Sequence, residues 1–342
     1  MPETLSRVTA TPESAVSAES AGRRTPITHV PLSTTPLPPL DESLPPWPGR
    51  TEQVRGLGLH VRRTEGAGHS TVVYVHGLGG SSTNWTDLAA QLAPFATGVA
   101  PDLPGFGFSE PQDGFLFTLD AHADVLAEFV AGLDAGPVHL VGNSMGGAIV
   151  LLLAARRPEL VRTLTLISPA MPDRRPDPRR LSDPRMALAY LPLVGRRVRR
   201  RLAAMGPEQR ARQVIELCFA NPDAFPASRL AELTEEHGAR AAFSWAAPAL
   251  ARSTLGIFRA WCARGEASLW RIAPTVTVPT LVVWGGQDRV ISARRAPRTA
   301  RLLPNARLLM LPGTGHVAQM ERPVSVAKAV LGMWEQVEAG KW

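Results

Sequence analysis

The chain has 342 residues, of which 44% are hydrophobic and 20% charged, as in globular proteins. Its formal net charge is +7, but neither zinc-finger spacing nor a basic repeat with interleaved aromatic residues accompanies this excess, so we expect no nucleic-acid partner. No apolar run is long enough to span a membrane and none follows the N-terminus as a signal peptide would, so we expect a cytoplasmic protein.

The first 48 residues are rich in Pro, Ser, Thr and Glu. Such a segment buries too little apolar surface to offset its chain entropy, so we expect a disordered tail over residues 1–48. Order is expected to begin near Arg50, with a hairpin of two edge strands, 51–55 and 59–64, around a Gly-Leu-Gly turn.

Strands and helices then alternate along the chain. Apolar, β-branched runs predict strands, and apolar residues at helical spacing predict the helices between them. This alternation predicts an α/β fold, with a mostly parallel central sheet and helices on both faces. The expected strands are 71–75, 98–101, 138–141, 163–167, 280–284 and 307–311, and the expected helices are 84–92, 119–133, 144–156, 293–303 and 323–337.

The alternation stops between residues 169 and 275, where only helical periodicity with recurring prolines is found. We expect a helical cap inserted between two sheet strands, above the carboxyl ends of the strands, where open α/β sheets bind ligands. The core then has two parts, 49–168 and 276–342. The basic run 196–201 in the cap has two interpretations, contact with acidic lipid or a solvated helix face.

Three candidate catalytic residues each follow a predicted parallel strand. Ser144 lies in a Gly-x-Ser-x-Gly motif between a strand and a helix, Asp288 follows strand 280–284, and His316 follows strand 307–311. A serine nucleophile needs a neutral histidine to take its proton and an anion to hold the imidazole. The sequence therefore predicts a Ser-His-Asp triad, with Asp173 and Asp177 as rival positions for the acid.

A triad of this kind also needs two backbone N–H donors for the oxyanion. The expected donors are Met145, directly after the nucleophile, and Leu78, in the glycine-rich loop after strand 71–75. We interpret His76 as structural, bonding this loop, His139 as a core histidine, and residues 102–109 as a tight structural loop beside the site. Cys218 and Cys262 are in no metal-binding pattern and fit a reducing compartment, and we expect neither a metal nor a cofactor.

These residues together resemble the α/β-hydrolase fold family. The resemblance covers about residues 50–340 and rests on the His76-Gly77 loop, residues 102–109, the elbow 142–147, Asp288 and Gly315-His316. Epoxide hydrolases and haloalkane dehalogenases of this family carry Asp at the nucleophile, whereas this chain has Ser144. The elbow is similar to that of carbon–carbon hydrolases of ring-fission products, but these usually have a Gly-Pro-Gly type oxyanion loop. The simpler His-Gly-x-Gly-Gly loop is shared with esterases and monoacylglycerol-type lipases.

The expected function is hydrolysis of a small carboxylic ester or acyl substrate through an acyl-enzyme on the serine. The alternatives are a carbon–carbon hydrolase of a keto acid bound by cap arginines, an acyltransferase, and a non-catalytic binding protein of the same fold. Nothing in the sequence indicates an oligomeric state. The cap residues that could wall an acyl pocket, or instead form the cap core, are Phe243, Trp245, Phe258, Trp261 and Trp270.

Overall fold

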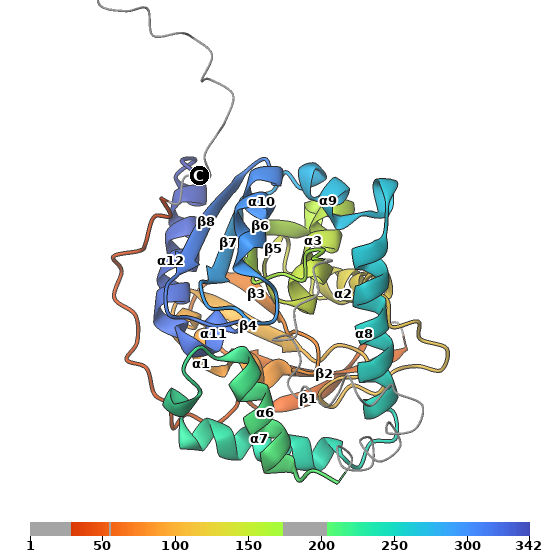
Figure 1. Cartoon of the computed structure of the whole chain (residues 1–342). Coiled ribbons are helices and arrows are strands. Elements are labelled where there is room, and N and C mark those ends of the chain that lie inside the picture. Colours follow the sequence, from red (N-terminus) through yellow and green to blue (C-terminus); the bar gives the residue numbers. More distant parts are fainter. Residues whose placement is uncertain (1–28, 55, 174–203) are drawn as a thin grey trace, which may run out of the picture.

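A sheet of eight strands lies at the centre of the computed structural model, which describes residues 29–54, 56–173 and 204–342 (Figure 1). The strand order is β1-β2-β4-β3-β5-β6-β7-β8. β1 (Gly49–Val54) and β2 (Leu57–Thr64) form the predicted hairpin, and β2 also pairs antiparallel with β4 (Ala96–Pro101). From β4 onward all neighbours are parallel, through β3 (Ser70–Val75), β5 (Val138–Asn143), β6 (Val161–Ile167), β7 (Thr280–Gly285) and β8 (Ala306–Leu311).

Helices cover both faces of the sheet, so its central strands are buried on both sides. Along β3, Val73 and Val75 pack in the core that includes α2 and α3, while Val72 and Tyr74 pack in the core that includes α1 and α12. This two-sided burial explains why the parallel strands read as continuous apolar runs. The helices on the faces are α1 (Thr86–Leu92), α2 (Leu119–Ala131), α3 (Met145–Arg156), α10 (Ala296–Leu302), α11 (Ala318–Glu321) and α12 (Pro323–Glu338).

Between β6 and β7 the described residues are helical, as the sequence predicts. The main helices are α6 (Pro207–Cys218), α7 (Ala227–Arg240) and α8 (Ala246–Cys262), which we call the inserted helices, followed by the short α9 (Leu269–Ile272). The basic run 196–201 and Asp177 lie outside the described residues. None of the helices in the described ranges has both the length and the hydrophobicity needed to cross a bilayer.

The prediction of a disordered tail up to residue 48 is wrong for residues 29–48, which form an ordered arm. In this arm Ser33 is buried, and its Oγ donates to Glu335 of α12 at 2.6 Å. Further along, the carbonyl of Leu44 accepts a hydrogen bond from Arg229 of α7. A segment of this composition cannot bury a core of its own, but the arm is held by packing on helices supplied by the rest of the chain. The arm therefore links α12 to the inserted helices.

One buried histidine in the fold has no polar partner. His122 of α2 is surrounded by the rings of Phe106, Phe115 and Phe117, and neither of its ring nitrogens has a hydrogen-bond partner among the described residues. Burial in this apolar surrounding lowers the pKa of His122 to about 3. The folded protein therefore holds this imidazole neutral, whereas the unfolded chain protonates it below pH 6.5, the ordinary pKa of histidine.

We predict that His122→Leu reduces the acid sensitivity of the fold. Between pH 6.5 and 3 the unfolded chain binds a proton at this site that the folded chain does not, so stability falls as the pH falls. From pH 7 to pH 5 the unfolding free energy of the wild type should drop about 2 kcal/mol more than that of the variant. Urea unfolding at both pH values measures this difference. Replacing the exposed His69 by Leu is the control, and equal losses in wild type and His122→Leu would contradict the prediction.

Candidate active site

Ser144 lies at the sharp turn between β5 and α3, in a backbone conformation that few residues adopt. Its φ is 53° and its ψ is −116°, outside the regions that an L-residue ordinarily occupies. Neighbouring glycines allow the turn: a Cβ on Gly146 would lie 2.2 Å from the carbonyl oxygen of Val75, and one on Gly142 would lie 2.6 Å from that of Gly146. The turn thus presents Ser144 at the N-terminus of α3, as the sequence motif predicts.

The predicted histidine and acid are in direct contact. Nδ1 of His316 lies 2.9 Å from Oδ2 of Asp288, and the other oxygen of Asp288 accepts the backbone N–H groups of Val290 and Ile291. Because an ionised carboxylate only accepts hydrogen bonds, the imidazole proton in this contact is on Nδ1. Nε2 of the neutral ring is then the free acceptor, which is the tautomer that a general base requires.

The structure gives the rival acid Asp173 a different partner. Oδ1 of Asp173 lies 2.5 Å from Nη2 of Arg295, and the carboxylate that contacts His316 is that of Asp288. The geometry therefore favours Asp288 over Asp173 as the acid.

Ser144 and His316 line one cavity, of about 590 Å³, between the sheet edge and the inserted helices. Its wall combines the loop after β3 with residues of α6, α7, α8 and α11. A polar side includes Arg210, His237 and Arg240. The rest is largely apolar, lined by Val214, Ile215, Phe219, Phe225, Leu233, Phe243, Leu250, Val317 and Met320.

Both predicted oxyanion donors lie beside Ser144. Leu78 lines the cavity and is the second residue of a turn in which Gly80 N–H donates to the Gly77 carbonyl, with Gly79 at φ 75°. Gly77 passes so close that a Cβ there would lie 3.1 Å from Cβ of Ser144. Met145 is the first residue of α3, so its N–H has no acceptor within the helix. Two backbone donors thus lie next to the serine.

His76 bonds the loop after β3, as expected from the sequence. Its Nε2 accepts the N–H of Leu103, and its Nδ1 donates to the carbonyl of Gly77. Complete burial is the main cause that lowers the pKa of His76, and the two contacts require the neutral ring with its proton on Nδ1. His76 therefore connects the Leu78 turn to the loop after β4. The other strand histidine, His139, stacks on Trp334 in the core.

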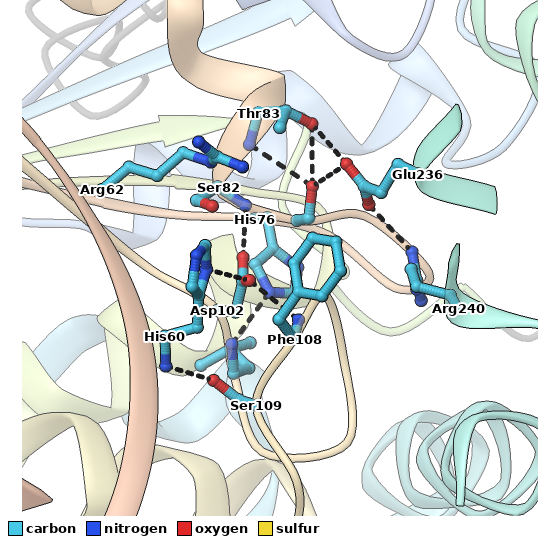
Figure 2. A network of polar contacts seen from close by, with 12 residues as sticks. His60, Arg62, His76, Ser82, Thr83, Asp102, Phe108, Ser109, Glu236 and Arg240 are labelled. Carbon is cyan, nitrogen blue, oxygen red and sulfur yellow. Dashed lines mark hydrogen bonds and ion pairs between the residues drawn. The ribbon is translucent and has the colours of Figure 1, made fainter. Parts of the chain in front are cut away.

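The loop after β4, residues 102–109, is closed around a buried carboxylate (Figure 2). Oδ2 of Asp102 lies 2.8 Å from Nδ1 of His60 and accepts the N–H of Phe108, while Oδ1 accepts the N–H of Ser82 at 2.6 Å. These hydrogen bonds hold the pKa of Asp102 below its ordinary value although burial acts in the opposite direction. The structural role predicted for this loop agrees with these contacts.

The sequence did not single out two side chains that hold the loop of His316. Nδ2 of Asn143 donates to the carbonyls of Ile167 and His316, both at 3.1 Å. Glu321 of α11 accepts the N–H of Gly315 and that of Ala220, at the end of α6. Asn143 directly precedes Ser144 in the motif, and this position is the sequence signal that could have identified it. Nothing near Glu321 in the sequence indicates that it holds the loop of His316.

Of the aromatic residues predicted to wall the pocket, Phe243 lines the cavity and Trp245 and Trp261 do not. Trp245 stacks on the ring of the same Phe243. Trp261 is buried in the core, where its indole N–H donates to the carbonyl of Ala170. Periodicity shows that such residues are on a helix but does not show which side of an inserted helix faces the cavity. Phe258, on the same helix as Trp261, is 55% exposed.

A family model for the α/β hydrolase fold matches residues 70–323. The chain belongs to this family. It is 29% identical to the dihydrolipoyllysine-residue acetyltransferase component of the acetoin cleaving system of Cupriavidus necator, over 78% of this chain and 64% of that longer protein. It is 27% identical to Lipase 3 of Moraxella sp., over 73% of this chain and 72% of the lipase. Among solved structures, a membrane phospholipase A described as a bacterial virulence factor has a TM-score of 0.69 and 27% identity, covering 85% of this chain and 86% of its own.

We predict that the elbow of this α/β hydrolase does not tolerate Gly146→Ala. The added Cβ would meet the backbone carbonyls of Val75 and His76 at 2.2 and 2.5 Å, and backbone cannot give way as a flexible side chain can. Overpacking of this kind costs about 1–3 kcal/mol or more. Gly286→Ala is the matched control, because its Cβ would meet nothing closer than 3.5 Å. Urea unfolding of both variants measures the difference, and equal stabilities would contradict the close packing described here.

Proposed function

We propose that this α/β hydrolase cleaves a carboxylic ester with an apolar acyl group, through an acyl-enzyme on Ser144. The observation that carries the proposal is the contact between His316 Nδ1 and the buried Asp288, together with the position of His316 and Ser144 on one cavity. A binding protein would need no such alignment of a serine, a histidine and a carboxylate.

In the proposed reaction Nε2 of His316 takes the hydroxyl proton of Ser144 as the oxygen attacks the ester carbonyl. Asp288 keeps the imidazole in the required tautomer and stabilises the imidazolium that forms. The N–H groups of Leu78 and Met145 bind the negative charge on the carbonyl oxygen, and the N-terminal end of α3 adds to this field. The alcohol then leaves with the proton of His316, and water activated by the same ring releases the acid.

The cavity supports an acyl substrate. Its largely apolar lining would solvate a hydrocarbon chain, and the inserted helices that supply this lining would act as the cap expected from the sequence. Two of the similar proteins are described as a lipase and a phospholipase A, both of which act on acyl esters.

Acyl transfer is a second candidate because one relative is an acetyltransferase component. The same acyl-enzyme would then pass its acyl group to a thiol or alcohol instead of water. Adding a dithiol such as dihydrolipoamide to the ester assay separates the two, since a transferase gives the thioester at the expense of free acid.

A keto-acid substrate is less well supported. That alternative needs a cap arginine to bind the substrate carboxylate. Arg240 lines the cavity, but it already lies 3.2 Å from Oε1 of Glu236, so its charge is compensated within the protein. For Arg240 this contact favours a neutral ester, and a keto-acid substrate would instead depend on Arg210, the other arginine that lines the cavity.

We predict that wild-type protein hydrolyses p-nitrophenyl esters across a chain-length series from acetate to palmitate and that Ser144→Ala lowers kcat/KM by about 10⁴-fold or more. A fluorophosphonate probe should label the wild type on this serine and leave the variant unlabelled. Ser168→Ala is the matched control, because Ser168 is also a buried serine with a positive φ at a strand end. Absence of turnover on every chain length would overturn the ester proposal.

The choice of acid gives a separate prediction. Asp288→Asn should lower kcat by about 10³- to 10⁴-fold, because an amide no longer holds the tautomer in which Nε2 accepts a proton. Asp173→Asn should instead weaken the contact with Arg295 and lower the melting temperature, with kcat changed by no more than a few fold. Steady-state kinetics and thermal unfolding of both variants test this, and the reverse pattern would make Asp173 the acid.

A further inference from the structure

Two charged residues of α7 hold the loop that contains Leu78. Both are far from this loop in sequence, and Figure 2 shows them beside it. Glu236 is 7% exposed, and one of its oxygens accepts the hydroxyls of Ser81 and Thr83, each at 2.8 Å. Its other oxygen lies 3.2 Å from Nη1 of Arg240, and the same Nη1 donates to the carbonyl of Gly79 at 3.0 Å. We call Glu236 and Arg240 the clasp.

The clasp contacts the loop at two places, one within the turn and one directly after it. Ser81 and Thr83 follow the turn, and the Gly79 carbonyl lies within it, one residue after Leu78. The loop has a further contact from the side of the sheet core, the hydrogen bond between His76 and the Gly77 carbonyl. The clasp comes from an inserted helix, so it ties the position of α7 to the position of the turn.

Because the clasp is largely buried, we expect it to contribute more to the positions of the atoms that it bonds than to the stability of the fold. Taking a carboxylate and a guanidinium out of water is costly, and a buried ion pair often adds little net stability. Such a pair does fix the atoms that it bonds, because hydrogen bonds to a charged group are stronger than those between neutral groups and are directional. Here the atoms that it fixes surround the N–H of a proposed oxyanion donor.

We propose that Glu236 and Arg240 are positioning residues, which hold the Leu78 N–H in place for the oxyanion. This inference rests on the proposed function, in which that N–H binds the developing charge. A donor displaced by a fraction of an ångström stabilises the transition state less, while binding of the uncharged ester is little affected.

The test compares two arginines of the same helix. Arg240→Met removes the clasp donor. Arg229→Met removes an arginine of the same helix whose hydrogen bonds within the described chain go to Asp87, at 2.6 Å, to Glu232 and to the Leu44 carbonyl, and not to the turn. Arg240→Met should lower kcat for the p-nitrophenyl esters about 10- to 100-fold, with KM changed less than twofold. Arg229→Met should lower the melting temperature and leave kcat within twofold. Arg240→Lys, which keeps the charge, should recover part of kcat, and Glu236→Gln should resemble Arg240→Met.

Amide hydrogen exchange of the segment 77–83 gives a readout that does not depend on turnover. Exchange in this segment should be faster in Arg240→Met than in wild type and unchanged in Arg229→Met. If the wild type cleaves no ester, the proposed function fails, and the exchange comparison still decides whether the clasp holds the turn. Unchanged exchange or an unchanged kcat in Arg240→Met overturns the inference. A change in KM alone also overturns it, because it would mark Arg240 as a substrate-binding residue. Equal kcat losses in Arg240→Met and Arg229→Met overturn it as well.

Discussion

The close approach of α3 to the loop after β3 is the constraint on which the site depends. Backbone lies directly against backbone there, because Gly146 has no side chain to keep the helix away from the carbonyls of Val75 and His76. This contact forces the abrupt turn in which Ser144 has a positive φ. It also places the first N–H groups of α3 beside the Leu78 turn. The positions of the proposed nucleophile and of the proposed oxyanion donors are thus consequences of one steric arrangement.

Around this contact, buried polar groups fix the loops at the carboxyl edge of the sheet. Asp102 bonds the loop after β4 to the hairpin and to the segment after β3, and His76 joins the loops after β3 and β4. Asn143 and Glu321 do the same for the loop of His316. Each makes two or more hydrogen bonds, as burial of a polar group requires. One set of hydrogen bonds thus joins the loops after β3 and β4, and a second set joins the loop of His316 to the segment that follows α6.

The order of strands and helices could be predicted from sequence because burial on both faces leaves uninterrupted apolar runs, and every strand expected from such a run is present. Ser144, Asp288 and His316 could be named because each directly follows a strand, and the carboxyl ends of parallel strands meet at one edge. The family model and the similar structures confirm the fold. The catalytic roles of these three residues stay predictions.

What the sequence did not reveal depends on contacts between distant segments. Glu236 lies on an ordinary amphipathic helix, and only the fold brings it to Ser81, 155 residues away. The arm 29–48 packs a few apolar residues, among them Val30 and Trp47, on a core that the rest of the chain supplies, and it bonds to α12, so its composition is misleading. Trp261 and Phe258 have similar neighbours in sequence, yet one is buried and the other exposed.

The tight packing of the sheet edge also determines where this protein can change its substrate range. A Cβ on Gly315 would overlap the Cys218 carbonyl at 2.2 Å, and one on Gly285 would overlap the Gly315 carbonyl at 1.9 Å, so these loops have no space for new side chains. Val214 of α6 and Leu250 of α8 line the cavity and are 42% and 44% exposed, so side chains at these positions have more room. Changes of substrate specificity, natural or engineered, are therefore expected in the inserted helices, at positions other than the two α7 residues that hold the Leu78 turn.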